Sequence, residues 1–352
     1  MTAALARRLL EREADGAAIV SLYLDLDPAQ FATAPARATQ VSSLMSDARA
    51  QAAALEESLD HGAARALRDD LTRLEDYLSS DELPVAQAHA LAVFAGGGQG
   101  PFESAPLPVA AGPAVHVARG PVIEPIVTAP ADPVWCAVLV ARDRAEIYRG
   151  AGRRILAHDH SADYVRGDSA EGGSTGHNEE QDAENHLIAV AERLLADFEH
   201  GRFAVLAIGG PVEAEAGLRD ALPGDLRRVL LEPRLEVDPS AAGGTEVADA
   251  VGALVEASDR ETRTKLLAAL ADGLDTDRGV DRATHAVAGA DAVRDALTEQ
   301  RVATLLLGSQ FADSEREALV QAAVRQDADV VAFADPVPEL PAPRPVAALL
   351  RF

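Results

Sequence analysis

Cysteine is almost absent from this sequence of 352 residues, since Cys136 is the single example. One cysteine excludes an internal disulfide and any metal site built from several thiolates. Trp135 precedes Cys136 and an apolar run, 137–140, follows it. We therefore expect Cys136 to be a buried strand residue, and not a nucleophile.

Long hydrophobic runs are also missing. No apolar stretch approaches the roughly 20 residues that a membrane-spanning helix requires. The first residues lead into the charged stretch Glu11-Arg12-Glu13 and not into the apolar core of a signal peptide. We therefore expect a cytoplasmic protein without a membrane partner.

Positive charge is scarce, and lysine is nearly lacking. The chain has 57 acidic against 32 basic residues, a net charge of −25, and Lys265 is its only lysine. Such an acidic chain is unsuited to general binding of polyanions such as DNA, so any contact with RNA must be local. Arginine suits bidentate contact with phosphate, although codon bias in a GC-rich genome is the favoured explanation of its excess.

Apolar residues make up 48% of the chain, enough to bury substantial cores in two or three domains. We expect residues 1–130 to form an α+β domain, with prolines at 121, 125, 130 and 133 marking a linker. The predicted elements are a short opening helix, a strand within 17–28, a helical hairpin over 36–79 that breaks at His61-Gly62, and strands at 88–94 and 101–104.

Residues 131–280 predict an α/β domain that begins with a meander of three short strands, at 135–141, 145–148 and 155–157. Residues 161–182 then contain four glycines among polar neighbours, which predicts a long loop of the kind that is usually functional. The elements expected after it are a helix that Asn178 can cap, a strand at 203–208, a helix at 212–222, a strand at 229–231, and two helices near 245–257 and 260–270.

Residues 281–352 predict a small α/β domain. Its expected elements are a helix at 290–299, a strand at 302–307, a helix at 314–326, and strands at 330–333 and 346–350. The whole chain is therefore expected to be a three-domain protein of the α/β class.

Four stretches, taken in order, resemble one known family. They are Val20-Ser21-Leu22-Tyr23-Leu24-Asp25-Leu26-Asp27-Pro28, the segment 137–150 (Ala-Val-Leu-Val-Ala-Arg-Asp-Arg-Ala-Glu-Ile-Tyr-Arg-Gly), the pair 292–297 and 302–307, and the terminal segment 346–352. The chain resembles the bacterial branch of the archaeo-eukaryotic class 1 release factor and Pelota superfamily, which includes Balon-type ribosome hibernation and rescue factors. This resemblance implies a middle domain that is ribonuclease-H-like or ribosomal-protein-like, and a last domain similar to kink-turn-binding ribosomal proteins.

The peptide-releasing members of this family depend on a Gly-Gly-Gln loop that reaches the peptidyl-transferase centre. At the corresponding place this sequence has Gly172-Gly173-Ser174, with His177 three residues later. Serine is too short to place its polar group where the glutamine lies, so the resemblance implies weak or absent hydrolysis. A Gly97-Gly98-Gln99 does occur in the first segment, where it predicts a hairpin turn. The codon-reading motif Asn-Ile-Lys-Ser is absent.

Five arginines lie close together in the meander and form the densest basic group of the sequence: Arg142, Arg144, Arg149, Arg153 and Arg154. They are the best candidates for contact with rRNA or tRNA phosphates. A solvated strand edge would explain some of them without RNA.

Histidines flank the predicted loop. Alternation in a strand places His158 and His160 on one face, with His177 and His186 beyond the loop. The sequence offers no third ligand at a diagnostic spacing, so we expect no metal and no cofactor. Gly209-Gly210-Pro211 follows a strand and precedes a helix, but lacks the further residues of a phosphate-binding loop.

The expected function is that of a ribosome-binding factor that occupies the A-site region in hibernation or stress protection. The expected partners are the ribosome, through its rRNA, with tRNA and a translational GTPase as further candidates. One alternative is an enzyme that cleaves peptidyl-tRNA or tRNA with other loop residues such as Ser174 or His177, although no nucleophile elbow supports it. The other is an acidic interaction protein that acts away from the ribosome.

Overall fold

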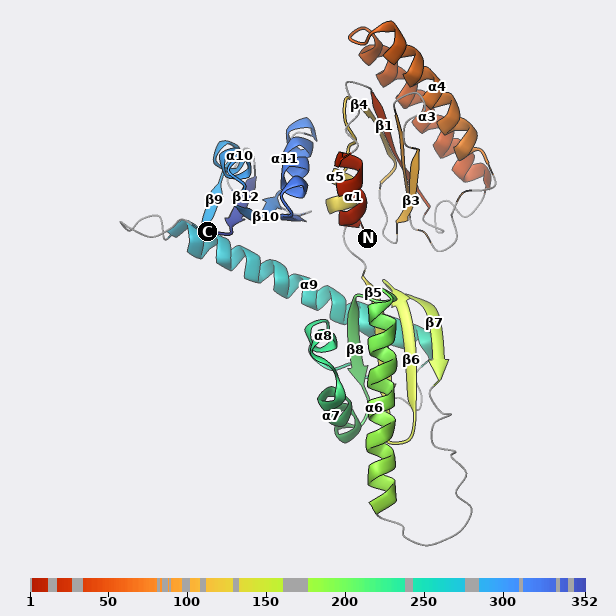
Figure 1. Ribbon diagram of the computed structural model, residues 1–352, viewed down its shortest axis with the longest axis vertical. Helices are drawn as coiled ribbons and strands as arrows, with labels where there is room; N and C mark the ends of the chain where they lie inside the picture. Colours follow the sequence, from red (N-terminus) through yellow and green to blue (C-terminus); the bar gives the residue numbers. More distant parts are fainter. Residues whose placement is uncertain are drawn as a thin grey trace. The chain divides into compact units, whose positions relative to one another are not determined.

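The computed structural model gives a mixed α/β protein whose described strands form three sheets of four strands each (Figure 1). The mixed α/β class predicted from the sequence is confirmed. The structure describes residues 2–11, 18–26, 34–80, 83, 88, 90–96, 102–107, 112–128, 133–160, 177–237, 243–275, 285–309, 313–333, 336–340 and 345–352. Within these ranges, no helix has the length and apolar character needed to cross a membrane.

The chain divides into two compact units. One comprises Met1–Ala131 together with Leu266–Phe352, and the other comprises Asp132–Lys265. Each of the three segments predicted from the sequence contains one of the sheets, whereas their division into three independent domains stays a prediction.

The first sheet is antiparallel, with the strand order β3-β2-β1-β4. Its strands are β1 (Ile19–Asp25), β2 (Ala90–Gly96), β3 (Glu103–Leu107) and β4 (Ala114–Ala118). Side chains of β1 alternate between the two faces, so Leu22 and Leu24 enter the core beneath the helical hairpin while Tyr23 enters a second core on the other face. The predicted hairpin is present as α3 (Ala34–Glu56) and α4 (His61–Leu78), but its break lies at 57–60 and not at His61-Gly62, which begin the second helix. Asp60 caps this helix by accepting the Ala63 N–H at 2.8 Å.

The second core joins the beginning of the chain to its end. Apolar residues of α1 (Thr2–Glu11) and α5 (Glu124–Thr128) pack with those of α10 (Ala290–Thr298) and α11 (Asp313–Arg325). Residues separated by about 300 positions therefore share one apolar core, which explains why they form a single compact unit.

The last sheet has the order β11-β10-β12-β9. Its strands are β9 (Ala286–Ala288), β10 (Val302–Leu307), β11 (Asp329–Ala332) and β12 (Val346–Leu350). β10 and β11 are parallel and α11 connects them, while β12 pairs antiparallel with β10 and β9. The strands expected at 302–307, 330–333 and 346–350 are thus confirmed.

The middle sheet has the order β7-β6-β5-β8. Its strands are β5 (Val134–Val140), β6 (Ala145–Ala151), β7 (Arg154–His160) and β8 (Val205–Gly209), so the predicted meander is confirmed. α6 (His177–Glu199), α7 (Val212–Ala221) and α8 (Gly224–Arg228) cover one face, and the start of α9 (Gly244–Asp275) covers the other. Cys136 is fully buried beneath α6, and the neighbouring Trp135 points to the α9 face.

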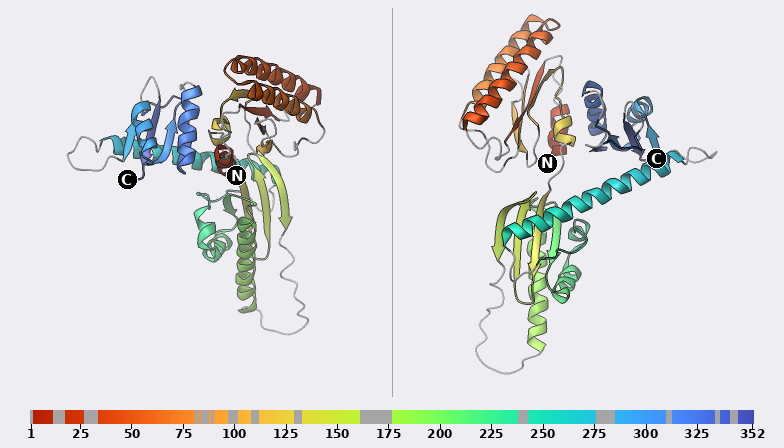
Figure 2. Two further views of the ribbon diagram at one scale, coloured as in Figure 1. Left: turned by 45° about the horizontal axis from the view of Figure 1, so that its top comes forward. Right: turned by 180° about the vertical axis from the view of Figure 1, so that it is seen from behind.

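Three further features differ from the sequence prediction. The two helices expected at 245–257 and 260–270 are one continuous helix, α9, because Ser258 and Asp259 are polar but compatible with helical backbone (Figure 2). The loop expected to run to residue 182 ends by His177, where α6 begins. Val229–Leu231 forms only an isolated bridge, between Leu206 and Leu230, and not a strand.

Candidate functional site

One edge of the middle sheet holds several of the residues that the sequence analysis selected. The parallel strands β5 and β8 both end there, and so does β7 (Figure 1). The β5–β6 turn contributes Arg142 and Arg144, both exposed, and β8 ends at Gly209 and is followed by Gly210. The connection from β7 to α6, which contains Gly172, Gly173 and Ser174, also starts at this edge; these three residues lie outside the described ranges, as do Gly97, Gly98 and Gln99.

The five arginines do not form one patch. Arg142 and Arg144 precede β6, whereas Arg153 and Arg154 follow it, and a strand of seven residues extends roughly 23 Å. Arg153 forms ion pairs with two acidic residues of α9, Asp249 at 3.3 Å and Glu256 at 3.4 Å.

Arg149 lies within β6, between these two turns, and its side chain points to the α6 face of the sheet. It is part of a charged cluster on the α6 face, where Asp159 pairs with Arg149 at 3.3 Å and with Arg193 of α6 at 3.0 Å. The five arginines are close in sequence, but they are divided between the two turns that flank β6 and the strand itself. Among the five, only Arg142 and Arg144 lie exposed at the edge where the Gly172–Ser174 connection begins.

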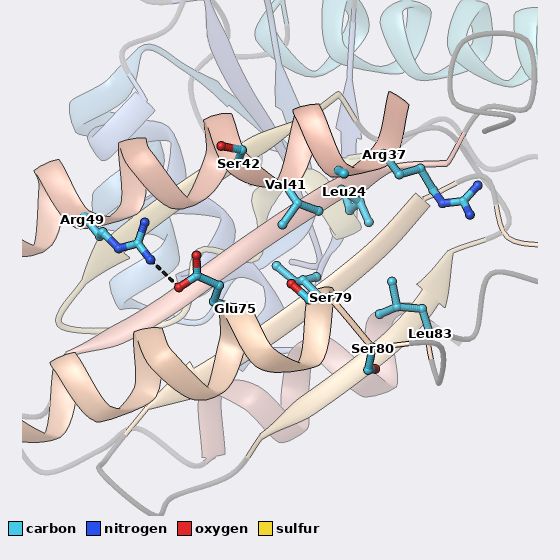
Figure 3. Close-up of a pocket in the computed structure, with 11 residues that line it drawn as sticks. Leu24, Arg37, Val41, Ser42, Arg49, Glu75, Ser79, Ser80 and Leu83 are labelled. Carbon is cyan, nitrogen blue, oxygen red and sulfur yellow. Dashed lines mark hydrogen bonds and ion pairs between the residues drawn. The ribbon is translucent and has the colours of Figure 1, made fainter. Parts of the chain in front are cut away.

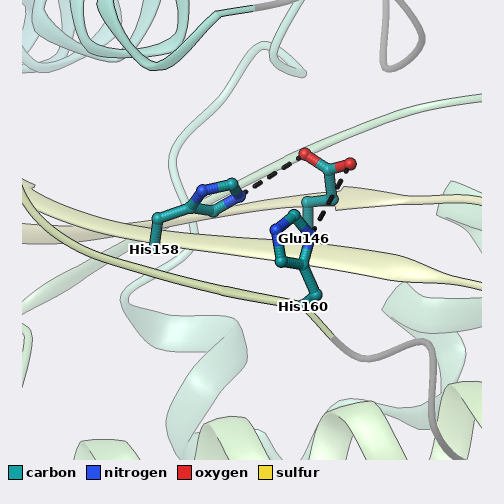
Figure 4. A group of neighbouring side chains, drawn as sticks. All are labelled: Glu146, His158 and His160. Carbon is teal, nitrogen blue, oxygen red and sulfur yellow. Dashed lines mark ion pairs between the residues drawn. The ribbon is translucent and has the colours of Figure 1, made fainter.

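A cluster of three possible metal ligands lies beside this edge, on the α9 face of the sheet: Glu146, His158 and His160 (Figure 4). The Oε2 atom of Glu146 lies 3.5 Å from His158 Nε2, and its Oε1 atom lies 4.0 Å from His160 Nδ1. All the possible ligand atoms lie within 4.8 Å of one another. Two imidazoles and a carboxylate therefore converge from two neighbouring strands.

Tyr148 fixes two members of this cluster. Its hydroxyl donates a hydrogen bond to Glu146 Oε2 at 2.6 Å, and its ring stacks on that of His158 with centroids 4.1 Å apart and an interplanar angle of 8°. Burial, followed by the hydrogen bond to Glu146, raises the pKa of Tyr148 to about 12. The phenol therefore stays protonated and remains a donor to the carboxylate across the physiological pH range.

Sequence reasoning found the two histidines of this cluster but missed the carboxylate. Strand pairing sets Glu146 opposite His160 and Tyr148 opposite His158, so ligands distant in sequence meet across a hairpin. The prediction that His158 and His160 share a face is confirmed. A search for polar residues at alternating positions on both strands of a predicted hairpin could have found Glu146.

His186, another histidine of the sequence analysis, is not a member of this cluster. His186 lies in α6 and is 3% exposed, and neither ring nitrogen has a hydrogen-bond partner among the described residues. His177 is the first residue of α6, and its side chain lies outside what the structure describes.

Gly209 and Gly210 have a packing role where they leave β8. Gly210 has a φ of +138°, and a Cβ atom there would lie 2.1 Å from the Val140 carbonyl oxygen. A Cβ at Gly209 would lie 2.6 Å from the Leu235 carbonyl oxygen. These glycines allow close approach of neighbouring backbone, which accounts for them without a bound phosphate.

The first unit contains a pocket of about 420 Å³ beneath the helical hairpin (Figure 3). Leu24, Val41 and Leu78 give it an apolar floor, and an ion pair between Arg49 and Glu75 crosses one end. Its lining includes no histidine and one carboxylate, which is already paired, so it has fewer reactive groups than the edge of the middle sheet.

Comparison with known proteins finds a family match that covers most of the unit Asp132–Lys265. Residues 121–256 match the family model of bacterial archaeo-eukaryotic release factor family 10. No curated protein matches the chain.

Among solved structures, an archaeal translation termination factor, aRF1, is 19% identical, with 100% of this chain and 97% of that chain covered and a TM-score of 0.25. Dom34 of S. cerevisiae, described as a termination-like factor interacting with Hbs1, is 11% identical over 72% of this chain and 73% of its own, with a TM-score of 0.47. An archaeal Pelota in a model of ribosome-bound Pelota and ABCE1 is 16% identical over 75% and 77%, with a TM-score of 0.43.

The family match covers the meander, the connection to α6, the helices of the middle unit and the start of α9. It includes the segment 137–150 on which the resemblance in the sequence partly rests. The resemblance to the bacterial branch of the archaeo-eukaryotic release factor superfamily is therefore confirmed over residues 121–256.

Proposed function

We propose that this protein is a ribosome-binding factor that occupies the A-site region and protects ribosomes in hibernation or stress, without releasing the peptide. The observation that supports it is the family match over residues 121–256, a range that contains Gly172-Gly173-Ser174. We propose that this tripeptide stands in place of Gly-Gly-Gln. A factor with the release-factor middle domain but without the glutamine keeps the means of binding and loses the group associated with hydrolysis.

The charge distribution is compatible with local binding to RNA. The chain has a net charge of −25, so most of its surface repels a polyanion. Arg142 and Arg144 are exposed at the edge where the segment with Ser174 begins, whereas Arg153 is paired with two carboxylates. We therefore propose that Arg142 and Arg144 contact phosphates. If the loop reaches the peptidyl-transferase centre, these two arginines would lie near its beginning.

The first experiment is co-sedimentation of the purified protein with bacterial ribosomes, empty or carrying peptidyl-tRNA, with released peptide measured in the same samples. Binding without release is the expected result. Binding with release would make the protein a rescue hydrolase, and no binding even at low salt would contradict the proposal and favour an interaction away from the ribosome.

A Ser174→Gln variant makes the test sharper because it restores the Gly-Gly-Gln sequence. If the loop reaches the peptidyl-transferase centre, this variant should gain release activity while its ribosome binding stays unchanged. Ser174→Ala is the matched control and should remain inactive. A translational GTPase is a further proposed partner, to be tested by adding the factor with and without GTP to the same binding assay.

A further inference from the structure

The cluster on β6 and β7 contains the donor set of a transition-metal site. Histidine nitrogens and carboxylate oxygens are common ligands of zinc and other divalent transition metals. We propose that Glu146, His158 and His160 bind one such ion, with Zn²⁺ as the best-suited candidate. This inference does not depend on the proposed ribosome binding.

The distances are close to those of a bound ion. Ligands about 2.0–2.1 Å from a tetrahedral zinc ion lie about 3.4 Å from one another. The separation between Glu146 Oε2 and His158 Nε2 is already 3.5 Å, and that between Glu146 Oε1 and His160 Nδ1 is 4.0 Å. Small side-chain rotations, without movement of the strands, would bring three ligands around one ion.

The site is accessible to an ion from solvent. Exposed fractions are 27% for the Glu146 side chain, 35% for His158 and 64% for His160. Three protein ligands would leave one position of a tetrahedron open, for water or for a donor from a binding partner. His160 ends β7 directly before the segment that contains Gly172-Gly173-Ser174, so an ion here would join the beginning of that segment to β6.

Tyr148 provides the outer shell that such sites require. Its hydrogen bond to Glu146 Oε2 orients the carboxylate, and its ring holds the imidazole of His158 in place by stacking. Outer-shell partners of this kind position ligands before the metal binds. A preformed cluster loses less side-chain entropy on binding an ion than three independent side chains would.

Ion pairing between the histidines and Glu146 is the competing explanation of the same geometry. It requires no ion and gives no stoichiometric metal binding. The two explanations are distinguished by titrating the full chain, stripped of metal with a chelator, with ZnCl₂ in a calorimeter. One Zn²⁺ per chain is expected, with no comparable heat from MgCl₂, because Mg²⁺ prefers oxygen ligands.

The variants locate the site. His160→Ala and Glu146→Gln should each weaken Zn²⁺ binding by more than the roughly 10- to 100-fold that loss of an outer-shell partner costs. Glu146→Gln keeps an oxygen that can accept the Tyr148 hydrogen bond, so a loss of affinity there reports the carboxylate and not the packing. His61→Ala removes an exposed histidine at the start of α4 and should leave affinity unchanged.

Circular dichroism of each variant checks that it is folded. Because the His160 side chain is largely exposed, its replacement by alanine should leave the fold intact. Absence of Zn²⁺ binding by the wild-type chain would overturn the proposal. So would binding that His160→Ala and Glu146→Gln leave as strong as in the wild type, because the ion would then lie elsewhere.

Discussion

The carboxylate of Glu317 in α11 accepts the backbone N–H of Ile123 at 2.9 Å, although the two residues lie 194 positions apart. Its second oxygen accepts the N–H of Glu124, also at 2.9 Å, so one side chain caps the start of α5. Glu124 in turn forms an ion pair with Arg316 at 2.8 Å. The beginning and end of the chain are therefore joined by charged hydrogen bonds as well as by their shared apolar core.

The first prediction concerns this connection. Glu317→Ala should lower the free energy of unfolding by about 1–3 kcal/mol, because it leaves two partly buried N–H groups without an acceptor. Urea denaturation measured by circular dichroism checks this value. Glu261→Ala, which removes an exposed carboxylate paired with the exposed Lys265 on α9, is the control and should change stability by about 0.5 kcal/mol or less.

Cys136 gives the second prediction. It is fully buried on β5, and this burial raises the pKa of its thiol well above the ordinary range. The reactive thiolate is therefore almost absent in the folded state, so a thiol reagent should label the native protein very slowly and label it completely in denaturant. Labelling at the rate of a free thiol under native conditions would contradict the assignment of Cys136 to the core.

The third prediction tests the close approach at the end of β8. Gly210→Ala should destabilise the protein by about 1–3 kcal/mol from backbone strain alone, with more from the clash with the Val140 carbonyl. Gly224→Ala is the matched control, because its Cβ would meet open space at the start of α8 and the backbone there accepts alanine. The control should be neutral or slightly stabilising. Equal destabilisation of both variants would show that the positive φ of Gly210 and its close approach to Val140 do not cause the effect.

Much of the fold could be predicted because local patterns determined it. Strand β12 follows from an apolar run with polar ends, and the α3–α4 hairpin follows from helical periodicity with a break near His61. The continuous α9 could not be predicted in the same way. A polar pair at Ser258-Asp259 resembles an interhelical turn in sequence, yet neither residue prevents helical backbone.

The candidate site was less predictable because its geometry depends on strand register. The arginines of the meander appear as one basic group in sequence, but the extended strand β6 separates Arg142 before it from Arg153 after it. Register brings Glu146 opposite His160, which no spacing along the chain indicates. Cross-strand pairs of this kind are non-local, so sequence periodicity alone does not determine them.

The fourth prediction follows from this separation of the arginines and rests on the proposed function. Replacing Arg142 and Arg144 together by glutamate should weaken ribosome binding and make it less sensitive to salt, with the salt slope falling by about 1 for each arginine that no longer binds a phosphate. Arg153→Glu removes the same kind of charge at the other end of β6 and should have little effect. Co-sedimentation over a series of salt concentrations checks both, and equally weakened binding in the two variants would show that binding does not depend on the edge of the sheet.

The fifth prediction separates the hydroxyl of Tyr148 from its ring. Tyr148→Phe keeps the stacking on His158 but removes the hydrogen bond to Glu146 Oε2, so the carboxylate loses its orientation. Affinity for Zn²⁺ should fall by about 10- to 100-fold while the stoichiometry of one ion per chain is kept. Calorimetric titration of the variant beside the wild type measures both quantities. An unchanged affinity would mean that the hydroxyl does not orient Glu146, and a complete loss of binding would mean that Tyr148 is itself a ligand or that its replacement displaces the histidines.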